Sequence, residues 1–293
     1  VIIDVAQKAL EQNYPDDKYE VIIIADSFQK KTLGALGNLP VNLLEVSFQK
    51  STKAKALNKA MAKIGDNYDI ALILDADNIM EKDFLKKINN AFSHDFVAIQ
   101  GHRTAKNTNT SLAILDAISE EVNNSIFRKG HRTLGLSSAL IGSGMAFDYT
   151  YFKNVMANVD AVGGFDKELE LKILQNKQKI EYLDDALVED EKIQESSAFA
   201  KQRKRWLSAQ FVYFGRFYKQ AIQQLIRKRN IDFADKVYQM VQPPRVVLLG
   251  LVFLIALIRV IFELNQWISS ESFFLSYAYW LVTFGIIILA FLL

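Results

Sequence analysis

Short apolar runs and amphipathic segments alternate along the first two thirds of the chain. Runs rich in β-branched residues predict buried strands at 19–25, 41–46, 71–74 and 96–100, and apolar residues at helical spacing predict helices at 52–64, 81–92 and 109–128. Strands that alternate with helices indicate an α/β fold with a doubly wound, mostly parallel sheet. Ligands bind at the carboxyl ends of the strands in such sheets, so functional side chains are expected there.

Acidic residues stand directly after two of these strands. Asp75 and Asp77 follow the run 71–74, and Asp26 follows the run 19–25. Side chains two apart on a strand face the same way, so Asp75 and Asp77 present hard oxygen donors that suit Mg²⁺ or Mn²⁺ on a diphosphate. A solvated turn is the commoner explanation of an isolated Asp-x-Asp. Asp26 would share the same rim and accept a hydrogen bond from a nucleotide, although a loop or capping role explains it equally well.

Glycines and further acidic residues mark the middle of the chain. Gly142 and Gly144 flank Ser143 in an apolar stretch, where they let the backbone approach a ligand or form a bulge. After a Gly-Gly pair, Asp166 and Glu168 begin a predicted helix, where acid stabilises the helix N-terminus and also suits a general base. The acidic run 187–191 is expected to be a solvated surface loop.

The segment from Lys201 to Leu225 predicts an amphipathic helix. It opens with Lys201-Gln202-Arg203-Lys204-Arg205-Trp206, and its apolar stripe comprises Leu207, Phe211, Phe214, Tyr218, Ile222 and Leu225. Such a helix is typical of a segment that lies on a membrane surface. Arg203 and Arg205 suit lipid headgroups, and arginine also binds a diphosphate bidentately.

Two long apolar runs, 246–262 and 273–293, end the chain. The first contains one charge, Arg259, and the second contains none. Since about 20 residues of helix span a bilayer, we predict two transmembrane helices, with a buried hairpin of a soluble protein as the alternative. Basic residues precede the first run, whereas the connection carries Glu263 and Glu271 without Lys or Arg. The positive-inside rule then predicts a multi-pass protein of the cell (cytoplasmic) membrane with its soluble part in the cytoplasm.

Composition excludes several other functions. The 293 residues include no cysteine, which excludes disulfides, zinc-thiolate sites and thiol nucleophiles. A net charge of +2 gives no basic face for nucleic acid. No Gly-x-Gly-x-x-Gly follows a strand, which disfavours a dinucleotide oxidoreductase. The chain starts at Val1 without a signal peptide and ends inside an apolar run, so we interpret it as part of a longer protein.

Together the motifs resemble membrane-bound family-two glycosyltransferases, the group of cellulose, hyaluronan and poly-N-acetylglucosamine synthases. The resemblance rests on Gln12 to Pro15, Asp26, Lys55-Ala56-Leu57-Asn58, Asp75-Ala76-Asp77, Gly142-Ser143-Gly144, Gly163 to Asp166 and Gln202-Arg203-Lys204-Arg205-Trp206. It implies a nucleotide-diphospho-sugar transferase (GT-A) fold over 1–200 with the first strand missing, interfacial helices over 201–245 and two transmembrane helices over 246–293.

The same resemblance implies roles for individual residues. Asp26 would contact the uracil and Lys55 the nucleotide, and Asp75 would hold the nucleotide while Asp77, with Asp75 beside it, binds the metal. Gly142, Ser143 and Gly144 would line the acceptor and diphosphate region. Gln202, Arg205 and Trp206 would close over the pyrophosphate and the acceptor sugar, with Arg203 in the same motif.

The catalytic base is the position where the sequence departs from the family pattern. The usual Thr-Glu-Asp lies several residues beyond the Gly-Gly pair, but here Gly-Gly-Phe-Asp runs straight into Lys-Glu-Leu. Counting back from Ile180 puts Asp166 in the catalytic position, and one gap would move the role to Glu168. Asp190 ranks third, because it falls close to Gln202.

The sequence therefore predicts a membrane-bound inverting enzyme. It would transfer a hexose or N-acetylhexosamine from a UDP-sugar to a growing polysaccharide or a lipid-linked acceptor, with a lipid bilayer and accessory membrane subunits as its other partners and no nucleic acid. The alternatives are a single-transfer glycolipid synthase and a non-catalytic membrane subunit that binds a nucleotide sugar.

Overall fold

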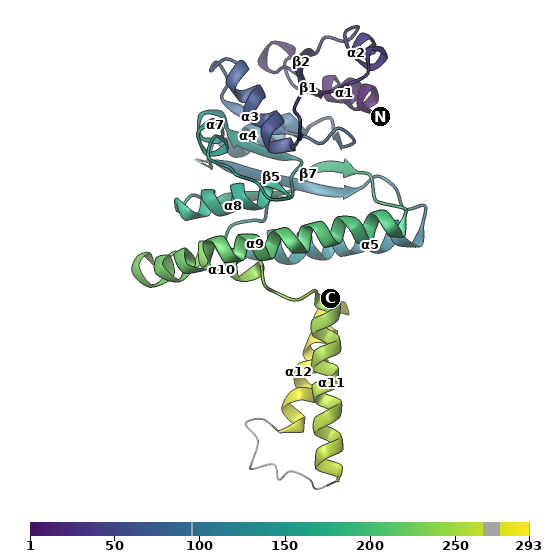
Figure 1. Cartoon of the computed structure of the whole chain (residues 1–293), viewed down its shortest axis with the longest axis vertical. Coiled ribbons are helices and arrows are strands. Elements are labelled where there is room, and N and C mark those ends of the chain that lie inside the picture. Colours follow the sequence, from purple (N-terminus) through teal and green to yellow (C-terminus); the bar gives the residue numbers. More distant parts are fainter. Residues whose placement is uncertain (95, 266–275, 293) are drawn as a thin grey trace. The chain divides into compact units, whose positions relative to one another are not determined.

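The computed structural model describes residues 1–94, 96–265 and 276–292, which form two units, Val1–Met240 and Val241–Leu293. The strands of the first unit are β1 (Ile22–Asp26), β2 (Asn42–Val46), β3 (Ile70–Ile73), β4 (Ile79–Met80), β5 (Ala98–Ala105), β6 (Met145–Asp148) and β7 (Ile180–Asp190). Its helices are α1 (Ile2–Leu10), α2 (Lys30–Leu36), α3 (Lys53–Lys63), α4 (Phe84–Phe92), α5 (Ser111–Asn123), α6 (His131–Thr133), α7 (Tyr149–Met156), α8 (Phe165–Gln175), α9 (Ser196–Lys228) and α10 (Ile231–Gln239) (Figure 1). A 3₁₀ turn covers Asp16–Lys18, and a π-helical segment, Asn124–Gly130, continues α5.

The first unit contains two sheets. A five-stranded sheet has the order β3-β6-β5-β7-β4, and β1 pairs only with β2 in a separate parallel ladder. β5 and β7 are parallel, whereas β6 is antiparallel to both β3 and β5, and β4 is antiparallel to β7. The predicted α/β alternation is confirmed, but the prediction of a mostly parallel sheet is wrong. An apolar run specifies a buried strand without specifying its direction or its neighbour.

Helices cover both faces of the five-stranded sheet. Adjacent residues of one strand point to opposite faces, so Ala98 belongs to the core beneath α7, α8 and α9, whereas Ile99 packs with α4 and α1. Figure 1 shows α8, α9 and α10 on one side of the sheet. The side chain of Thr52 accepts a hydrogen bond from the Lys55 N–H and caps α3.

The long helix α9 has two apolar faces. Tyr213, Phe217, Ala209 and Ala221 are buried against the domain. The predicted apolar stripe lies on the opposite side, where Phe211 is 63% exposed and Ile222 is 56% exposed. Most of the stripe is therefore a surface feature of the first unit, although Phe214 is half-buried and packs against the core.

The second unit contains α11 (Arg245–Leu264) and α12 (Tyr277–Leu292), which contact each other through the rings of Phe253 and Phe284. Within the described residues, one helix, Val247–Leu264, is long and apolar enough to cross a membrane. The 16 residues of α12 are fewer than a bilayer usually requires, and the predicted residues 273–275 and 293 lie outside the described part. A second transmembrane helix thus stays a prediction.

Candidate functional site

The loop after β3 carries Asp75 into a cluster of polar contacts. Its carboxylate forms an ion pair with Lys53, the first residue of α3, and the Lys53 ammonium also donates a 2.7 Å hydrogen bond to the Gly142 carbonyl. The Asp75 N–H donates to Ser143 Oγ at 2.9 Å. Asp75 and the Gly142–Gly144 segment, 67 or more residues apart in sequence, are therefore joined through one lysine and one serine.

Asp77 lies beside Asp190 as well as Asp75. The Asn78 amide donates hydrogen bonds to Asp77 Oδ1 at 3.2 Å and to Asp190 Oδ1 at 2.8 Å, which holds the two carboxylates near each other. Burial raises the pKa of Asp77, and the negative charges of Asp190 and Asp75 raise it further. A positive ion near Asp77 would remove this repulsion.

Asp190 belongs to this cluster and not to a surface loop, so the prediction for the run 187–191 is wrong. It ends β7 and pairs in register with Ala105 of β5. Burial acts to raise the pKa of Asp190, but the charges of Arg103 and Lys192 outweigh burial and hold the pKa below its usual range. Lys192 also pairs with Glu120, and both are buried. The sequence pattern of this run is typical of a solvated loop, because Arg103, which compensates the Asp190 charge, is distant in the sequence.

The buried side chain of Gln100 forms hydrogen bonds with the backbone of the segment from Ile141 to Gly144. The Gln100 amide donates to the carbonyls of Ser143 at 3.0 Å and Gly144 at 3.3 Å, and its oxygen accepts from the Ile141 N–H at 3.0 Å. Gly142 and Gly144 have φ values of 87° and 61°. A side chain at Gly144 would lie 3.0 Å from Val188 Cγ2. Both glycines are therefore required by backbone conformation, and the second also by space.

Asp166 and Glu168 point to different surroundings. A Cβ atom added to Gly142 would lie 3.8 Å from Asp166 Cγ, so the Asp166 carboxyl adjoins the segment that Lys53 contacts. Burial raises the pKa of Asp166. Glu168 is buried, accepts a 3.2 Å hydrogen bond from the Asp160 N–H and pairs with Arg216 at 3.7 Å. Of the two, Asp166 is the one next to the glycine segment.

Asp26 and Lys55, the residues predicted to contact the nucleotide, both make contacts within the protein. Asp26 accepts hydrogen bonds from Ser27 Oγ at 3.1 Å and from Ser51 Oγ. Because β1 lies in a separate ladder, Asp26 and Asp75 share no sheet edge, and the segment from Ser51 to Lys53 connects them instead. The Lys55 ammonium is turned to the Lys50 carbonyl at 3.1 Å.

The segment Gln202 to Trp206 forms an early turn of α9. Arg203 pairs with Asp116 of α5, and its guanidinium lies 4.8 Å and 4.9 Å from the ring centroids of Phe199 and Trp206. Arg205 is exposed, and Gln202 is partly buried. Arg203 thus joins α9 to α5, while Arg205 remains accessible to a ligand.

The same helix is fixed to the Gly-Gly turn that precedes Asp166. Tyr213 Oη accepts a 2.9 Å hydrogen bond from the Val162 N–H and donates one of 3.1 Å to the Gly164 carbonyl. Gly163 has φ 93°, and a Cβ atom there would lie 2.8 Å from Ala209 Cβ. The turn can pack this closely only because residue 163 is glycine.

A divalent metal fits these residues only with help from a ligand. Among the described residues, no three carboxylate or imidazole side chains converge closely enough to hold a metal ion. Asp75 is already paired with Lys53, whereas the raised pKa of Asp77 marks a carboxylate that a cation would stabilise. Mg²⁺ commonly binds one or two carboxylates together with substrate phosphates, so Asp77 fits such a metal when a diphosphate supplies the other oxygens.

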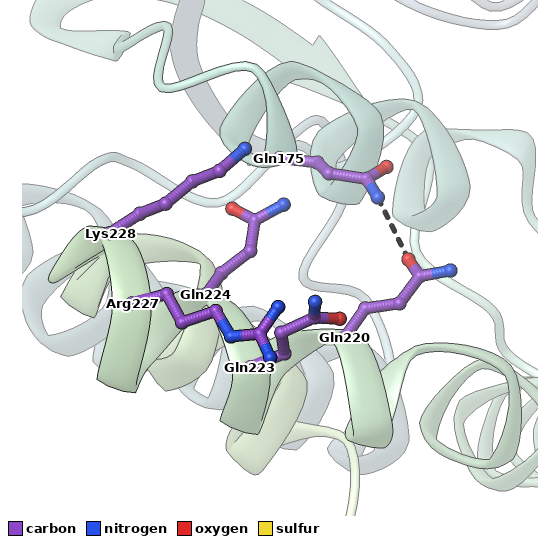
Figure 2. Close-up of a pocket in the computed structure, with 6 residues that line it drawn as sticks. All are labelled: Gln175, Gln220, Gln223, Gln224, Arg227 and Lys228. Atoms are coloured by element: carbon purple, nitrogen blue, oxygen red, sulfur yellow. Dashed lines mark hydrogen bonds between the residues drawn. The ribbon is translucent and has the colours of Figure 1, made fainter.

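A polar cavity of the first unit lies elsewhere. Its volume is about 360 Å³, and it is lined by Gln175, Gln220, Gln223, Gln224, Arg227 and Lys228, which Figure 2 shows. Gln175 ends α8 whereas Asp166 lies in its first turn, which separates them by about 14 Å at 1.5 Å per residue. This polar cavity is distinct from the acidic cluster.

A family model described as glycosyltransferase-like family 2 matches residues 1–209. The chain belongs to this family. The match covers every site residue described above except those after Ala209, so the acidic cluster, the glycine segment and the start of α9 all lie within the glycosyltransferase region.

Individual relatives of this glycosyltransferase are distant. The β-monoglucosyldiacylglycerol synthase of Synechocystis sp. is 25% identical over 220 residues, which cover 70% of this chain and 44% of that protein. The chain therefore spans less than half of that relative. A mannosyltransferase from Pyrobaculum calidifontis, solved with GDP-Man and Mn²⁺, is 15% identical with a TM-score of 0.54. The match covers 99% of this chain and 81% of the mannosyltransferase chain. TarS of S. aureus, solved with UDP-GlcNAc, is 14% identical with a TM-score of 0.48. The match covers 72% of this chain and 62% of the TarS chain.

Two residues of the candidate site escaped sequence analysis. Lys53 reaches Asp75 although Lys55 was the lysine expected near the nucleotide, and Gln100 lies inside a strand. Asp190 was considered only as the third candidate for the base, and its place beside Asp77 was not foreseen. The signal that was present for Gln100 is a polar residue in the apolar run 96–100, since a buried amide needs partners.

Proposed function

We propose that this glycosyltransferase is a membrane-bound inverting enzyme that moves a hexose or N-acetylhexosamine from a UDP-sugar to a growing polysaccharide or a lipid-linked acceptor. The observation that carries the proposal is the convergence at Gly142. Its carbonyl accepts from Lys53, which also pairs with Asp75, and the Asp166 carboxyl adjoins it. The Lys53–Asp75 ion pair, which would face the diphosphate, and the half-buried Asp166 carboxyl are thus next to each other.

Each group has a proposed role. Asp26 would accept a hydrogen bond from the uracil, and Lys53 and Arg205 would balance the charge of the diphosphate. Asp77, with Asp75 beside it, would hold Mg²⁺ or Mn²⁺, which would supply positive charge for the departing UDP. Support for a metal comes from the raised pKa of Asp77.

Asp166 would take the proton from the acceptor hydroxyl. Burial raises the pKa of its carboxyl, which brings the basicity of the carboxylate closer to the working pH. The acceptor oxygen would then attack the anomeric carbon from the side opposite UDP, so that the carbon–oxygen bond to UDP breaks as the new bond forms and the configuration inverts.

The decisive experiment replaces Asp77 by Asn in the full-length enzyme. We expect sugar transfer in purified membranes to be lost while the protein folds and inserts normally. Normal transfer by Asp77→Asn would refute the proposed metal site. Asp83→Asn is a matched control, because Asp83 precedes α4 and contacts Asn13, outside the acidic cluster.

A single-transfer glycolipid synthase is the second candidate. It is favoured by the likeness to a glycolipid synthase and by the exposed apolar stripe of α9, which would bring the site to lipid. Product length distinguishes the two, since one sugar per acceptor indicates the synthase and a ladder indicates a polymer. A protein that binds the UDP-sugar with no transfer or hydrolysis would instead be the non-catalytic subunit.

A further inference from the structure

The polar cavity of the first unit is lined by residues from the ends of α8 and α9 (Figure 2). Among the described residues that line it, none is apolar or acidic. Five of the six recur at helical spacing on one face of α9, namely Gln220, Gln223, Gln224, Arg227 and Lys228. The match to the family model ends at residue 209, so this face lies outside the matched region.

A hydrogen-bond network fixes the direction of the Gln224 amide. Asn230 Oδ1 accepts from the Phe233 N–H at 3.3 Å. The Asn230 amide nitrogen therefore donates the 2.8 Å hydrogen bonds to the Leu174 carbonyl and to Gln224 Oε1. The Gln224 oxygen is thereby engaged, no described residue accepts from its NH₂ group, and the side chain lines the cavity (Figure 2). Gln224 is only 9% exposed, and a buried amide needs partners, so its N–H donors suit a ligand.

A second pair of amides lies on another side of the cavity. Gln175 Nε2, at the end of α8, donates a 2.8 Å hydrogen bond to Gln220 Oε1 of α9 (Figure 2). Each amide keeps further donor or acceptor capacity, because a side-chain amide has two N–H groups and an oxygen with two lone pairs. A hydroxyl group both donates and accepts. The cavity therefore suits a ligand with several hydroxyl groups.

Two cations complete the lining. Arg227 and Lys228 lie in the last turn of α9, a helix that contains no acidic residue, and no described acidic residue pairs with either of them. Positive charge at a helix C-terminus is stabilising, which explains why cations occur there. It does not explain why both side chains line a cavity of amides, where Figure 2 shows Lys228 extended toward Gln175. Paired cations beside uncharged donors suit a phosphate group.

We propose that this cavity binds a phosphorylated sugar unit, either free or at the end of a glycan. Arg227 and Lys228 hold the phosphate, and the glutamine amides hold the hydroxyl groups. The volume of about 360 Å³ lies within the range of about 300–1,000 Å³ for small-molecule sites. The site goes beyond the proposed transfer, because Gln175 lies about 14 Å along α8 from Asp166. It can therefore be occupied while the donor site is filled.

The test measures binding of radiolabelled glucose 1-phosphate to the full chain in detergent, with Mg²⁺ and excess UDP so that the donor site is filled. We expect one site per chain. Arg227→Gln with Lys228→Gln should weaken binding about tenfold or more, the value of a charged hydrogen bond. Gln224→Leu and Gln220→Leu should also weaken binding, and thermal midpoints show that each variant is folded. Lys219→Gln, an exposed cation of α9 outside the cavity lining, is the matched control and should stay within about twofold.

The other outcomes overturn the proposal. It is wrong if the wild-type chain does not bind glucose 1-phosphate, or if the cavity variants bind it as tightly as the wild type. Equal affinity for inorganic phosphate, with no effect of Gln224→Leu or Gln220→Leu, would show a simple anion site and refute a sugar ligand. No sugar transfer is needed in these measurements, so their failure is separate from a failure of the proposed function.

Maltotriose 1-phosphate, which carries two more sugars, then distinguishes the two sources of the ligand. Affinity equal to that for glucose 1-phosphate would show a cavity that is open to the end of a glycan. Weaker binding would show that the cavity takes a free phosphorylated monosaccharide.

Discussion

At the scale of single residues, helix geometry decides which of two lysines reaches the acidic cluster. Lys53 and Lys55 both lie in the first turn of α3, and residues two apart on a helix point in nearly opposite directions. Lys53 pairs with Asp75, whereas Lys55 turns back to the Lys50 carbonyl. The nucleotide contact expected of Lys55 therefore fits Lys53 better.

Replacing Lys53 by Met should lower kcat/KM for the UDP-sugar by about 10- to 100-fold, the value of one charged hydrogen bond. Lys55→Met is the matched control and should stay within about twofold, because an exposed lysine contributes little. Steady-state transfer by the full-length enzyme measures both. Equal losses in the two variants would contradict the assignment.

Experiment should also distinguish Asp166 and Glu168, the two candidate bases in α8. Asp166→Asn removes the proposed base and should lower kcat by about 10²- to 10⁴-fold. Glu168→Gln weakens the ion pairs of the buried Glu168 with Lys172 and Arg216, so it should reduce the thermal midpoint and change kcat much less. A larger loss of kcat in Glu168→Gln would move the base to that residue.

The pH profile gives an independent test of Asp166. Its pKa is raised by burial, and only the carboxylate form accepts a proton. Activity should therefore be present above this raised pKa and fall as the pH drops through it, at a higher pH than an ordinary aspartate would give. A plot of kcat/KM against pH for the wild-type enzyme measures this limb, and an acidic limb in the usual aspartate range would contradict it.

At the scale of elements, α9 is positioned by close packing of Ala209 against Gly163, which has no side chain. Gly163 lets the turn before α8 pack against Ala209, and Tyr213 hydrogen-bonds on both sides of the same turn. The helix that carries Gln202 to Trp206 and the turn that carries Asp166 are therefore held together. A disturbance of one is expected to displace the other.

Gly163→Ala should lower stability by about 1–3 kcal/mol, because it combines a strained φ with a close contact to Ala209. Adding Ala209→Gly removes the clash and leaves the strain, so the double variant should recover part of the loss. Thermal unfolding in detergent measures the cycle, with Gly34→Ala, where a Cβ meets open space, as control. Strictly additive effects would mean that the two residues do not press on each other.

A buried ion pair attaches α10 to α8. Lys236 Nζ lies 3.3 Å from Glu170, which also pairs with Lys167 and accepts from the Leu140 N–H. Burial lowers the pKa of Lys236, and burial acts to raise the pKa of Glu170 until the two lysine charges outweigh it. Removing Lys236 alone would leave the buried Glu170 carboxylate with Lys167 as its remaining lysine partner.

Lys236→Met should therefore cost up to about 3 kcal/mol, and Lys236→Met with Glu170→Gln should restore part of it. The comparison of thermal midpoints tests this, with exposed Lys63→Met as the control. A loss in the double variant as large as the sum of the two single losses would show that the pair is not coupled.

At the scale of the whole molecule, an α/β unit of the glycosyltransferase family is followed in the chain by a unit of apolar helices. Charge along the sequence predicts that the first unit is cytoplasmic. In cells that express the full chain, a membrane-impermeant maleimide should label Lys86→Cys, on the exposed side of α4, only after permeabilisation. Ser269→Cys, which follows the candidate membrane helix in the sequence and lies outside the described residues, should be labelled in intact cells if Val247–Leu264 crosses the membrane. The reverse pattern would invert the topology, and protection of both sites would mean that Val247–Leu264 does not cross.

The sequence by itself determined the alternation of strands and helices, the position of acid after β3, the amphipathic stripe of α9 and the membership in a glycosyltransferase family. Those features depend on local periodicity and on the order of short motifs. Only the tertiary structure decided that β6 runs antiparallel, that Lys53 and not Lys55 meets Asp75, and that Asp190 joins Asp77. It also decided that Gln175 and the end of α9 line one polar cavity. These depend on strand direction and on contacts between residues far apart in the chain, which a linear pattern does not encode.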